Sequence, residues 1–109
     1  MNMAVQSPTS DEQNIEAKIQ SKGLKAPRLC PADIDAAISA VQYYVFPGTT
    51  TTVCCLTLKN GFTTIGKSAS ASPENFNEEI GKEIAFKNAR EEVWALEGYL
   101  LKQRLFETV

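Results

Sequence analysis

Polar and apolar side chains alternate most clearly between residues 50 and 66. The pattern predicts a strand from Thr50 to Lys59, because side chains of a strand point to opposite faces in turn. One face of this strand carries apolar side chains at Cys54, Leu56 and Leu58. The Asn60-Gly61 dipeptide that follows is typical of a two-residue hairpin loop of type I′. Such a loop pairs Leu56 with Ile65, so we expect both side chains in the core.

Two helical patterns precede this hairpin. Ser10 followed by Gln13 is a capping-box pattern, and a weak apolar stripe runs from there to Gly23, so we expect a short first helix. Cys30-Pro31 begins a second helix whose apolar positions are Ile34, Ile38 and Val41. The β-branched and aromatic run from Gln42 to Phe46 then predicts a strand, which Pro47-Gly48 ends with a turn.

A long helix is expected at the C-terminal end of the chain. Ser72 as N-cap and Pro73 in the first turn predict its start, and the helix-compatible sequence continues to about Leu105, with a break near Gly81 left open. At 100° per residue its apolar positions form two stripes rather than one. One stripe holds Ala85, Phe86, Ala89, Val93, Leu96 and Leu100, and the other holds Ile80, Ile84, Trp94, Leu101 and Leu105.

The second stripe predicts self-association. A helix packed on its own sheet buries only one stripe, so the other must meet another subunit or other parts of the same chain. We expect a homo-oligomer, a dimer or higher, with an interface formed by Trp94, Gly98, Leu101 and Leu105. The alternative is that the N-terminal helices cover this stripe within one chain, through Ile15, Ile19, Ile34 and Ile38.

Together these patterns predict an α+β fold with short N-terminal helices, a three-stranded antiparallel sheet and a long C-terminal helix. With 109 residues, of which 43% are hydrophobic, the chain has enough apolar surface for one core. We therefore expect residues 10–109 to form a single domain, with residues 1–9 as a flexible lead.

Charge and apolar content exclude two classes of partner. A formal net charge of −2 provides no general basic field, so bulk nucleic acid is not an expected ligand, although a small anion needs only a few local cations. No apolar run approaches the roughly 20 residues of a membrane span, and the first ten residues do not form a signal peptide. We expect a cytoplasmic protein without membrane contact.

Conventional catalytic chemistry is not indicated. The chain contains no histidine, which excludes Ser-His and Cys-His pairs and removes the commonest transition-metal ligand. Its three cysteines are Cys30, Cys54 and Cys55, and the adjacent pair would point to opposite faces of a strand. Buried thiols are therefore expected, with no metal and no cofactor, and we do not expect an enzyme.

The segment from Lys67 to Asn77 is the candidate ligand site. It places hydroxyls and amides beside a predicted helix N-terminus, where N–H groups and the helix dipole favour a phosphate. Its candidate binding residues are Lys67, Ser68, Ser70, Asn75 and Asn77. An ordinary capped loop is the competing interpretation. Phe62 falls on the mostly polar sheet face, as a ligand platform, a subunit contact or a contact within the chain.

The chain combines several short motifs over about residues 31 to 105. They are Phe46-Pro47-Gly48-Thr49, Asn60-Gly61-Phe62, Gly66 with Ser68-Ala69, Asn75-Phe76 and the run from Trp94 to Leu101. In this combination the chain resembles a family of small tailed-phage and prophage proteins, most of which have no assigned function. It is also similar to the anti-Thoeris sponge proteins, which sequester the cyclic ADP-ribose-type signal of bacterial TIR-domain enzymes.

The sponge resemblance implies a non-catalytic oligomer in the host cell cytoplasm that binds a cyclic nucleotide-like anion without cleaving it. It carries Phe62, Asn75 and Asn77 over as binding residues, with Arg90 as a basic helix residue. Many relatives have Cys where this chain has Ser70 and Asp where it has Asn77, which leaves the identity of the nucleotide open. The alternative function is a host-takeover protein that binds a bacterial protein through its C-terminal helix.

Overall fold

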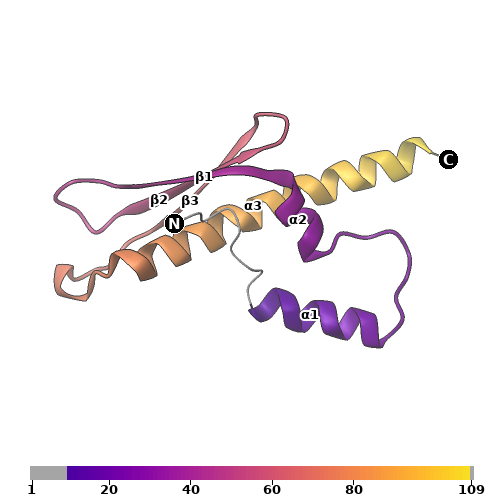
Figure 1. Cartoon of the computed structure of the whole chain (residues 1–109), viewed down its shortest axis with the longest axis horizontal. Helices are drawn as coiled ribbons and strands as arrows, with labels where there is room; N and C mark the ends of the chain where they lie inside the picture. The colour runs from indigo at the N-terminus through magenta and orange to yellow at the C-terminus, as the bar shows by residue number, and fades with distance from the viewer. Residues whose placement is uncertain (1–9, 109) are drawn as a thin grey trace.

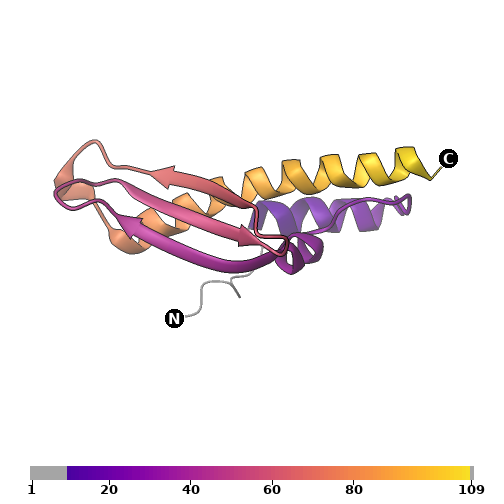
Figure 2. The same cartoon turned by 90° about the horizontal axis from the view of Figure 1, so that it is seen from above.

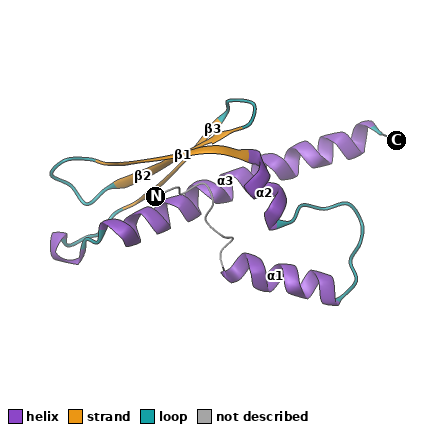
Figure 3. Ribbon diagram, viewed as in Figure 1, coloured by secondary structure: helices purple, strands orange, loops and turns teal. Residues whose placement is uncertain are grey.

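A computed structural model describes residues 10–108, so the expected lead at residues 1–9 lies outside the described part of the chain. Helices, a three-stranded antiparallel sheet and a long C-terminal helix confirm the α+β class (Figures 1 and 3). The elements in chain order are α1 (Ser10–Ser21), α2 (Pro31–Ala37), β1 (Ile38–Val45), β2 (Thr52–Leu58), β3 (Thr63–Ser68), the 3-10 helix η2 (Pro73–Asn75) and α3 (Glu78–Glu107).

The helix α3 is the axis of the molecule. The sheet, in the order β1-β2-β3, lies along one side of α3, and α1 lies on the other side (Figure 1). With 30 residues, α3 is about 45 Å long, whereas strands of six to eight residues reach roughly 20–26 Å. The last turns of α3 therefore project beyond the sheet, as Figure 2 shows from above.

The core lies between the inner face of the sheet and the facing side of α3. Alternate residues of β2 are buried, which confirms the predicted face of Cys54, Leu56 and Leu58. The first predicted stripe of α3 packs against that face, and its buried members are Ala85, Phe86, Ala89 and Val93. Gly66 on β3 lets the helix approach closely, because a Cβ there would overlap the backbone of α3.

The predicted hairpin register is wrong by one residue. Leu56 pairs with Thr64, and Ile65 pairs with Cys55 on the adjacent strand. Because neighbouring side chains alternate between faces, this shift sends Ile65 outward, where 50% of it is exposed. Thr64 instead points into the core, and its hydroxyl donates a hydrogen bond of 3.0 Å to the Ala89 carbonyl of α3.

The reason for the shift is a hairpin loop of three residues rather than two. The Leu58 N–H donates to the Phe62 carbonyl at 2.7 Å, and the Gly61 N–H donates to the Leu58 carbonyl at 2.9 Å. Gly61 has a φ of +91°, whereas Asn60 does not have a positive φ. A type I′ turn requires positive φ at both central residues, so the loop is instead a turn followed by a left-handed glycine that forms a bulge.

Two predicted helix boundaries are also wrong. The second helix ends at Ala37, and Ile38 begins β1 by pairing with Leu58. Ile38 is β-branched, so a strand suits its side chain well, and from β1 the side chain is still buried in the core. The long helix does not start at Ser72 but at Glu78, after the separate turn of η2, and it continues through Gly81 without a break.

The helix α1 begins and ends as predicted but makes no apolar contribution to the core. Gly23, with a φ of +65°, ends it through hydrogen bonds from Gly23 N–H to the Gln20 carbonyl and from Leu24 N–H to the Ile19 carbonyl. No residue of α1 is buried, and Ile15 is 58% exposed. Ile15 therefore takes no part in the expected alternative, in which the N-terminal helices cover the second stripe of α3, whereas Ile34 and Ile38 are buried in the core and Ile19 is half-buried.

Candidate functional site

Four of the predicted ligand residues lie together at the N-terminal end of α3. Ser68, Ser70, Asn75 and Asn77 line one small hollow, next to Phe76 and the first turns of the helix. A second hollow of about 380 Å³ adjoins it, between the β1–β2 loop and η2. The hollow that the four residues line is itself about 50 Å³, so only the second hollow reaches the roughly 300–1,000 Å³ of small-ligand sites.

Hydrogen bonds within the chain hold this cluster in place. The Ser68 hydroxyl donates to the Gly81 carbonyl at 2.6 Å, and the Thr50 hydroxyl donates to the Ser70 carbonyl at 2.7 Å. The Asn77 side-chain oxygen accepts from the Ile80 N–H at 2.9 Å, which makes Asn77 the N-cap of α3. The predicted loop residues are thus brought together, while several of their polar atoms already have partners in the chain.

Phe62 and Lys67 lie apart from this cluster. Phe62 follows the hairpin loop at the opposite end of β3 and is 58% exposed. Ser68 lies six positions further along the chain, a distance of about 20 Å in a strand. Lys67 alternates with Ser68 and is exposed, so its side chain lies on the outer face of the sheet. Within one chain, Phe62 cannot stack on a ligand held by Asn75.

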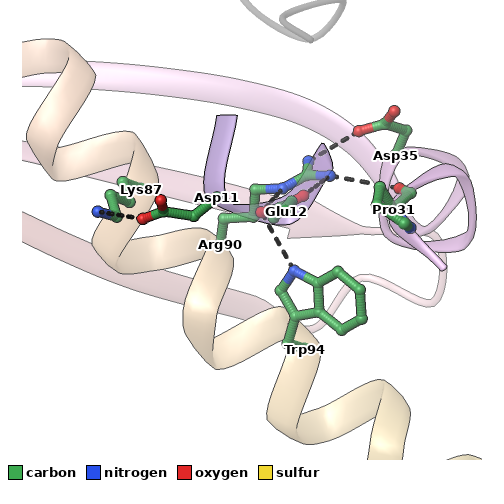
Figure 4. A network of polar contacts seen from close by, with 7 residues as sticks. All are labelled: Asp11, Glu12, Pro31, Asp35, Lys87, Arg90 and Trp94. Atoms are coloured by element: carbon green, nitrogen blue, oxygen red, sulfur yellow. Dashed lines mark hydrogen bonds and ion pairs between the residues drawn. The ribbon is translucent and has the colours of Figure 1, made fainter. Parts of the chain in front are cut away.

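Arg90 is almost completely buried, with 1% of its surface exposed, and it connects three helices. Its Nε and one terminal nitrogen donate to both carboxylate oxygens of Glu12 at 2.8 and 3.0 Å. The other terminal nitrogen donates to Asp35 at 2.7 Å, and a weaker bond reaches the Pro31 carbonyl (Figure 4). Burial alone would lower the pKa of Arg90, but its bonds to Glu12 and Asp35 outweigh it and raise the pKa above its ordinary value.

Arg90 lies 13 residues beyond Asn77 along α3, which corresponds to about 20 Å. The predicted binding residues thus occupy four separate places on one chain: the cluster, Phe62, Lys67 and Arg90. The carboxylate partners of Arg90 were not anticipated from the sequence. Glu12 and Asp35 come from helices 78 and 55 residues away, and no local pattern in the sequence connects them to α3.

The second stripe of α3 is mostly uncovered. Ile80, Ile84 and Leu105 are 54%, 46% and 42% exposed, and Trp94 is partly buried against the core. The indole N–H of Trp94 donates to Glu12 at 3.3 Å (Figure 4). A Cβ added at Gly98 would meet only the Leu29 side chain, at 3.9 Å. Of the predicted interface residues, Leu105 is exposed, whereas Trp94, Gly98 and Leu101 are half-buried within the chain.

A larger hollow, of about 520 Å³, lies near the hairpin loop between α2 and the second half of α3. Its charged lining mixes Arg28, Lys59 and Arg104 with Asp33 and Glu97. Sequence reasoning missed it, because the lining comes from separate segments whose mixed charges are typical of a solvated surface. The mixed signs give this hollow no clear preference for an anion.

The cysteines are thiols rather than disulfide partners. Cys54 is fully buried, and burial raises the pKa of its thiol to about 12, so it stays protonated at neutral pH. Cys55 faces the opposite side of β2 and is partly exposed, as is Cys30. Between residues 10 and 108 no three His, Cys, Asp or Glu side chains gather as metal ligands. None of the described helices has the length and apolar content to cross a membrane.

Comparison with known proteins places most of the chain in one family. The model of the Phage protein (N4 Gp49/phage Sf6 gene 66) family matches residues 29–105, which include everything from α2 to the last turns of α3. The matched part excludes α1. No curated protein and no solved structure matches the chain.

Proposed function

The chain belongs to the N4 Gp49/phage Sf6 gene 66 family of phage proteins, and from that premise we propose that it is a non-catalytic sponge for a bacterial immune signal. The signal would be a cyclic nucleotide or a cyclic ADP-ribose-like molecule, bound and sequestered in the host cytoplasm. The observation that carries this proposal is the cluster of Ser68, Ser70, Asn75 and Asn77 around one hollow at the N-terminal end of α3.

The cluster offers the chemistry that such a ligand requires. Hydroxyls and amides recognise ribose and base edges, and the positive end of a helix dipole favours a phosphate. Asn75 and Asn77 are at this end of the helix, within reach of an entering molecule. Binding by these groups breaks no covalent bond, so the ligand would be released uncleaved.

An oligomer would complete this site. Phe62 lies about 20 Å along β3 from the cluster, so Phe62 could serve this site as an aromatic platform only from a second copy. The exposed side chains of the second stripe, Ile80, Ile84 and Leu105, support such an assembly. Of the other predicted interface residues, Trp94, Gly98 and Leu101 are half-buried within the chain. Leu101→Glu should give a folded monomer in light scattering coupled to size exclusion, whereas a wild-type monomer at micromolar concentration would contradict the oligomer.

A depletion assay tests the sponge. Purified protein is incubated with lysate that contains the signal, then heated, and the released fraction is tested for signalling activity. A sponge removes the activity and returns it after heating, whereas an enzyme removes it permanently. A lysate that keeps its activity throughout would contradict the proposal.

Phe62→Ala should weaken signal binding about tenfold or more, because stacking on a base is worth roughly 1–3 kcal/mol. Phe106→Ala is the matched control, since Phe106 is 67% exposed near the end of α3, far from the cluster. Titration calorimetry with the released signal measures both variants. Equal affinity of wild type and folded Phe62→Ala would remove Phe62 from the site.

A second function is favoured by a different observation, the exposed aromatic residues on the projecting end of α3. Tyr99 and Phe106 are 73% and 67% exposed there, which suits a host-takeover protein that docks a bacterial protein on this helix. In that case Phe106→Ala would lose the partner while Phe62→Ala would keep it. The two variants therefore separate the sponge from the host-takeover function.

A further inference from the structure

Charged groups form the hydrogen bonds and ion pairs that attach the helix α1 to the rest of the molecule, and Ile19 is its one half-buried apolar side chain. None of its residues is buried, and its apolar Ile15 is 58% exposed. An isolated helix of 12 residues is only marginally stable in water, so its contacts decide whether it stays in place. Two of them reach α3: Glu12 binds Arg90 and Trp94, and Asp11 lies 3.9 Å from Lys87.

The groups that receive these carboxylates all belong to one side of α3. Lys87, Arg90 and Trp94 are spaced three and four residues apart, which places them on adjacent turns of the same helix face. Arg90 holds both oxygens of Glu12 in a fork, and the Trp94 N–H reaches one of the same oxygens. Figure 4 shows these donors converging on the Glu12 carboxylate.

A phosphate group presents oxygens to an arginine fork in the same way as a carboxylate does. We propose that Lys87, Arg90 and the indole N–H of Trp94 form an oxyanion site for a phosphate-bearing ligand, and that Glu12 of docked α1 occupies this site in the absence of the ligand. Ligand binding and α1 docking then exclude each other. The helix acts as a displaceable arm.

The charges around Arg90 support this exchange. Asp35 binds the terminal nitrogen that Glu12 leaves free, so the edge formed by Nε and the other nitrogen becomes available when α1 leaves. With Asp11 and Glu12 gone, the two cations at Lys87 and Arg90 face one remaining carboxylate partner, Asp35. The site lies about 20 Å along α3 from Asn77, so its occupancy does not depend on the proposed sponge activity.

Pyrophosphate is the probe for the wild-type protein. The chain has a single tryptophan, so the fluorescence of Trp94 reports directly on the site. Pyrophosphate should change this fluorescence and speed tryptic cleavage at Lys18 and Lys22, which follow Glu12 on the released arm. Sodium chloride at equal ionic strength is the control for screening. If it produces the same changes, the proposed site is refuted.

Glu12→Gln and Glu16→Gln form a matched pair in the full chain. Both remove one carboxylate from α1, but Glu16 pairs with Arg28 at 2.7 Å instead of with Arg90. Glu12→Gln should bind pyrophosphate about tenfold more tightly than wild type, because it removes the competing charged bonds. Glu16→Gln should bind it like wild type. Equal affinity of the two variants would overturn the proposal, and the wild-type titration decides it if Glu12→Gln does not fold.

Discussion

One added methyl group at Gly98 should stabilise a single folded chain but destabilise an oligomer of this chain. In a single chain, the methyl group of Gly98→Ala has room, since a Cβ at this position would meet only the Leu29 side chain at 3.9 Å. Glycine inside a helix costs about 0.5–1 kcal/mol relative to alanine. Gly98→Ala should therefore stabilise the monomer against unfolding by roughly that amount.

In an assembly built on the second stripe, Gly98 lies between Trp94 and Leu101 at the contact between two helices. Each copy then inserts one extra methyl into a close approach, and overpacking of this kind costs about 1–3 kcal/mol. We expect the dissociation constant to rise about tenfold or more, because about 1.4 kcal/mol corresponds to a factor of ten. This loss exceeds the gain in helix propensity.

The two effects separate by concentration. Sedimentation velocity across a dilution series measures assembly, and urea unfolding at the lowest and highest concentrations measures stability. Gly98→Ala should unfold later than wild type when dilute but earlier when concentrated. If the variant is more stable at every concentration and its assembly is unchanged, Gly98 does not lie at an interface, and the reasoning from the second stripe is refuted.

Three further predictions follow from the packing and the ion pairs. Gly66→Ala should lose about 2–3 kcal/mol of stability in urea unfolding, since its Cβ would overlap the backbone of α3; a loss below about 0.5 kcal/mol would contradict the close approach. Thr52→Val should be neutral or stabilising, because the buried Thr52 hydroxyl has no hydrogen-bond partner. Thr64→Val should lose about 1 kcal/mol of stability, because it removes the hydrogen bond to α3. Equal losses of stability in the two variants would contradict this. Hydrogen bonds from Arg28 and then Gln20 lower the pKa of Glu16 from 4.5 to about 2, so this support of α1 is complete above about pH 4.5 and is lost as the pH falls towards 2. The loss should appear as lower amide protection in α1 relative to the intrinsic exchange rate at each pH. Protection that does not change over this range would exclude Glu16 as a support of the helix.

The fold class could be predicted because each element carries a local signal. The alternation of β2 and the first stripe of α3 specify the buried faces without any tertiary information. The hairpin register could not, because Asn60-Gly61 is compatible with both a two-residue and a three-residue loop. The choice between them depends on packing across the sheet. Thr64, rather than Ile65, fits beneath α3 with its hydroxyl bonded to the helix.

The part of the candidate site that is local in sequence could also be predicted. Ser68, Ser70, Asn75 and Asn77 are close in sequence, so a short turn brings them together. The position of Phe62 depends on the length of β3, which separates the two ends of the sheet. Arg90 was identified as a basic helix residue, but its burial depends on carboxylates from distant helices that no spacing rule connects.

The three-residue hairpin loop also constrains how the gene can vary in length at this point. Adding or deleting one residue between Leu58 and Phe62 would exchange the inner and outer side chains along all of β3. Thr64 and Gly66 would then face solvent, and Lys67 would face α3. A change of two residues would preserve the parity of the strand. Functional homologues should therefore differ in this loop by even numbers of residues.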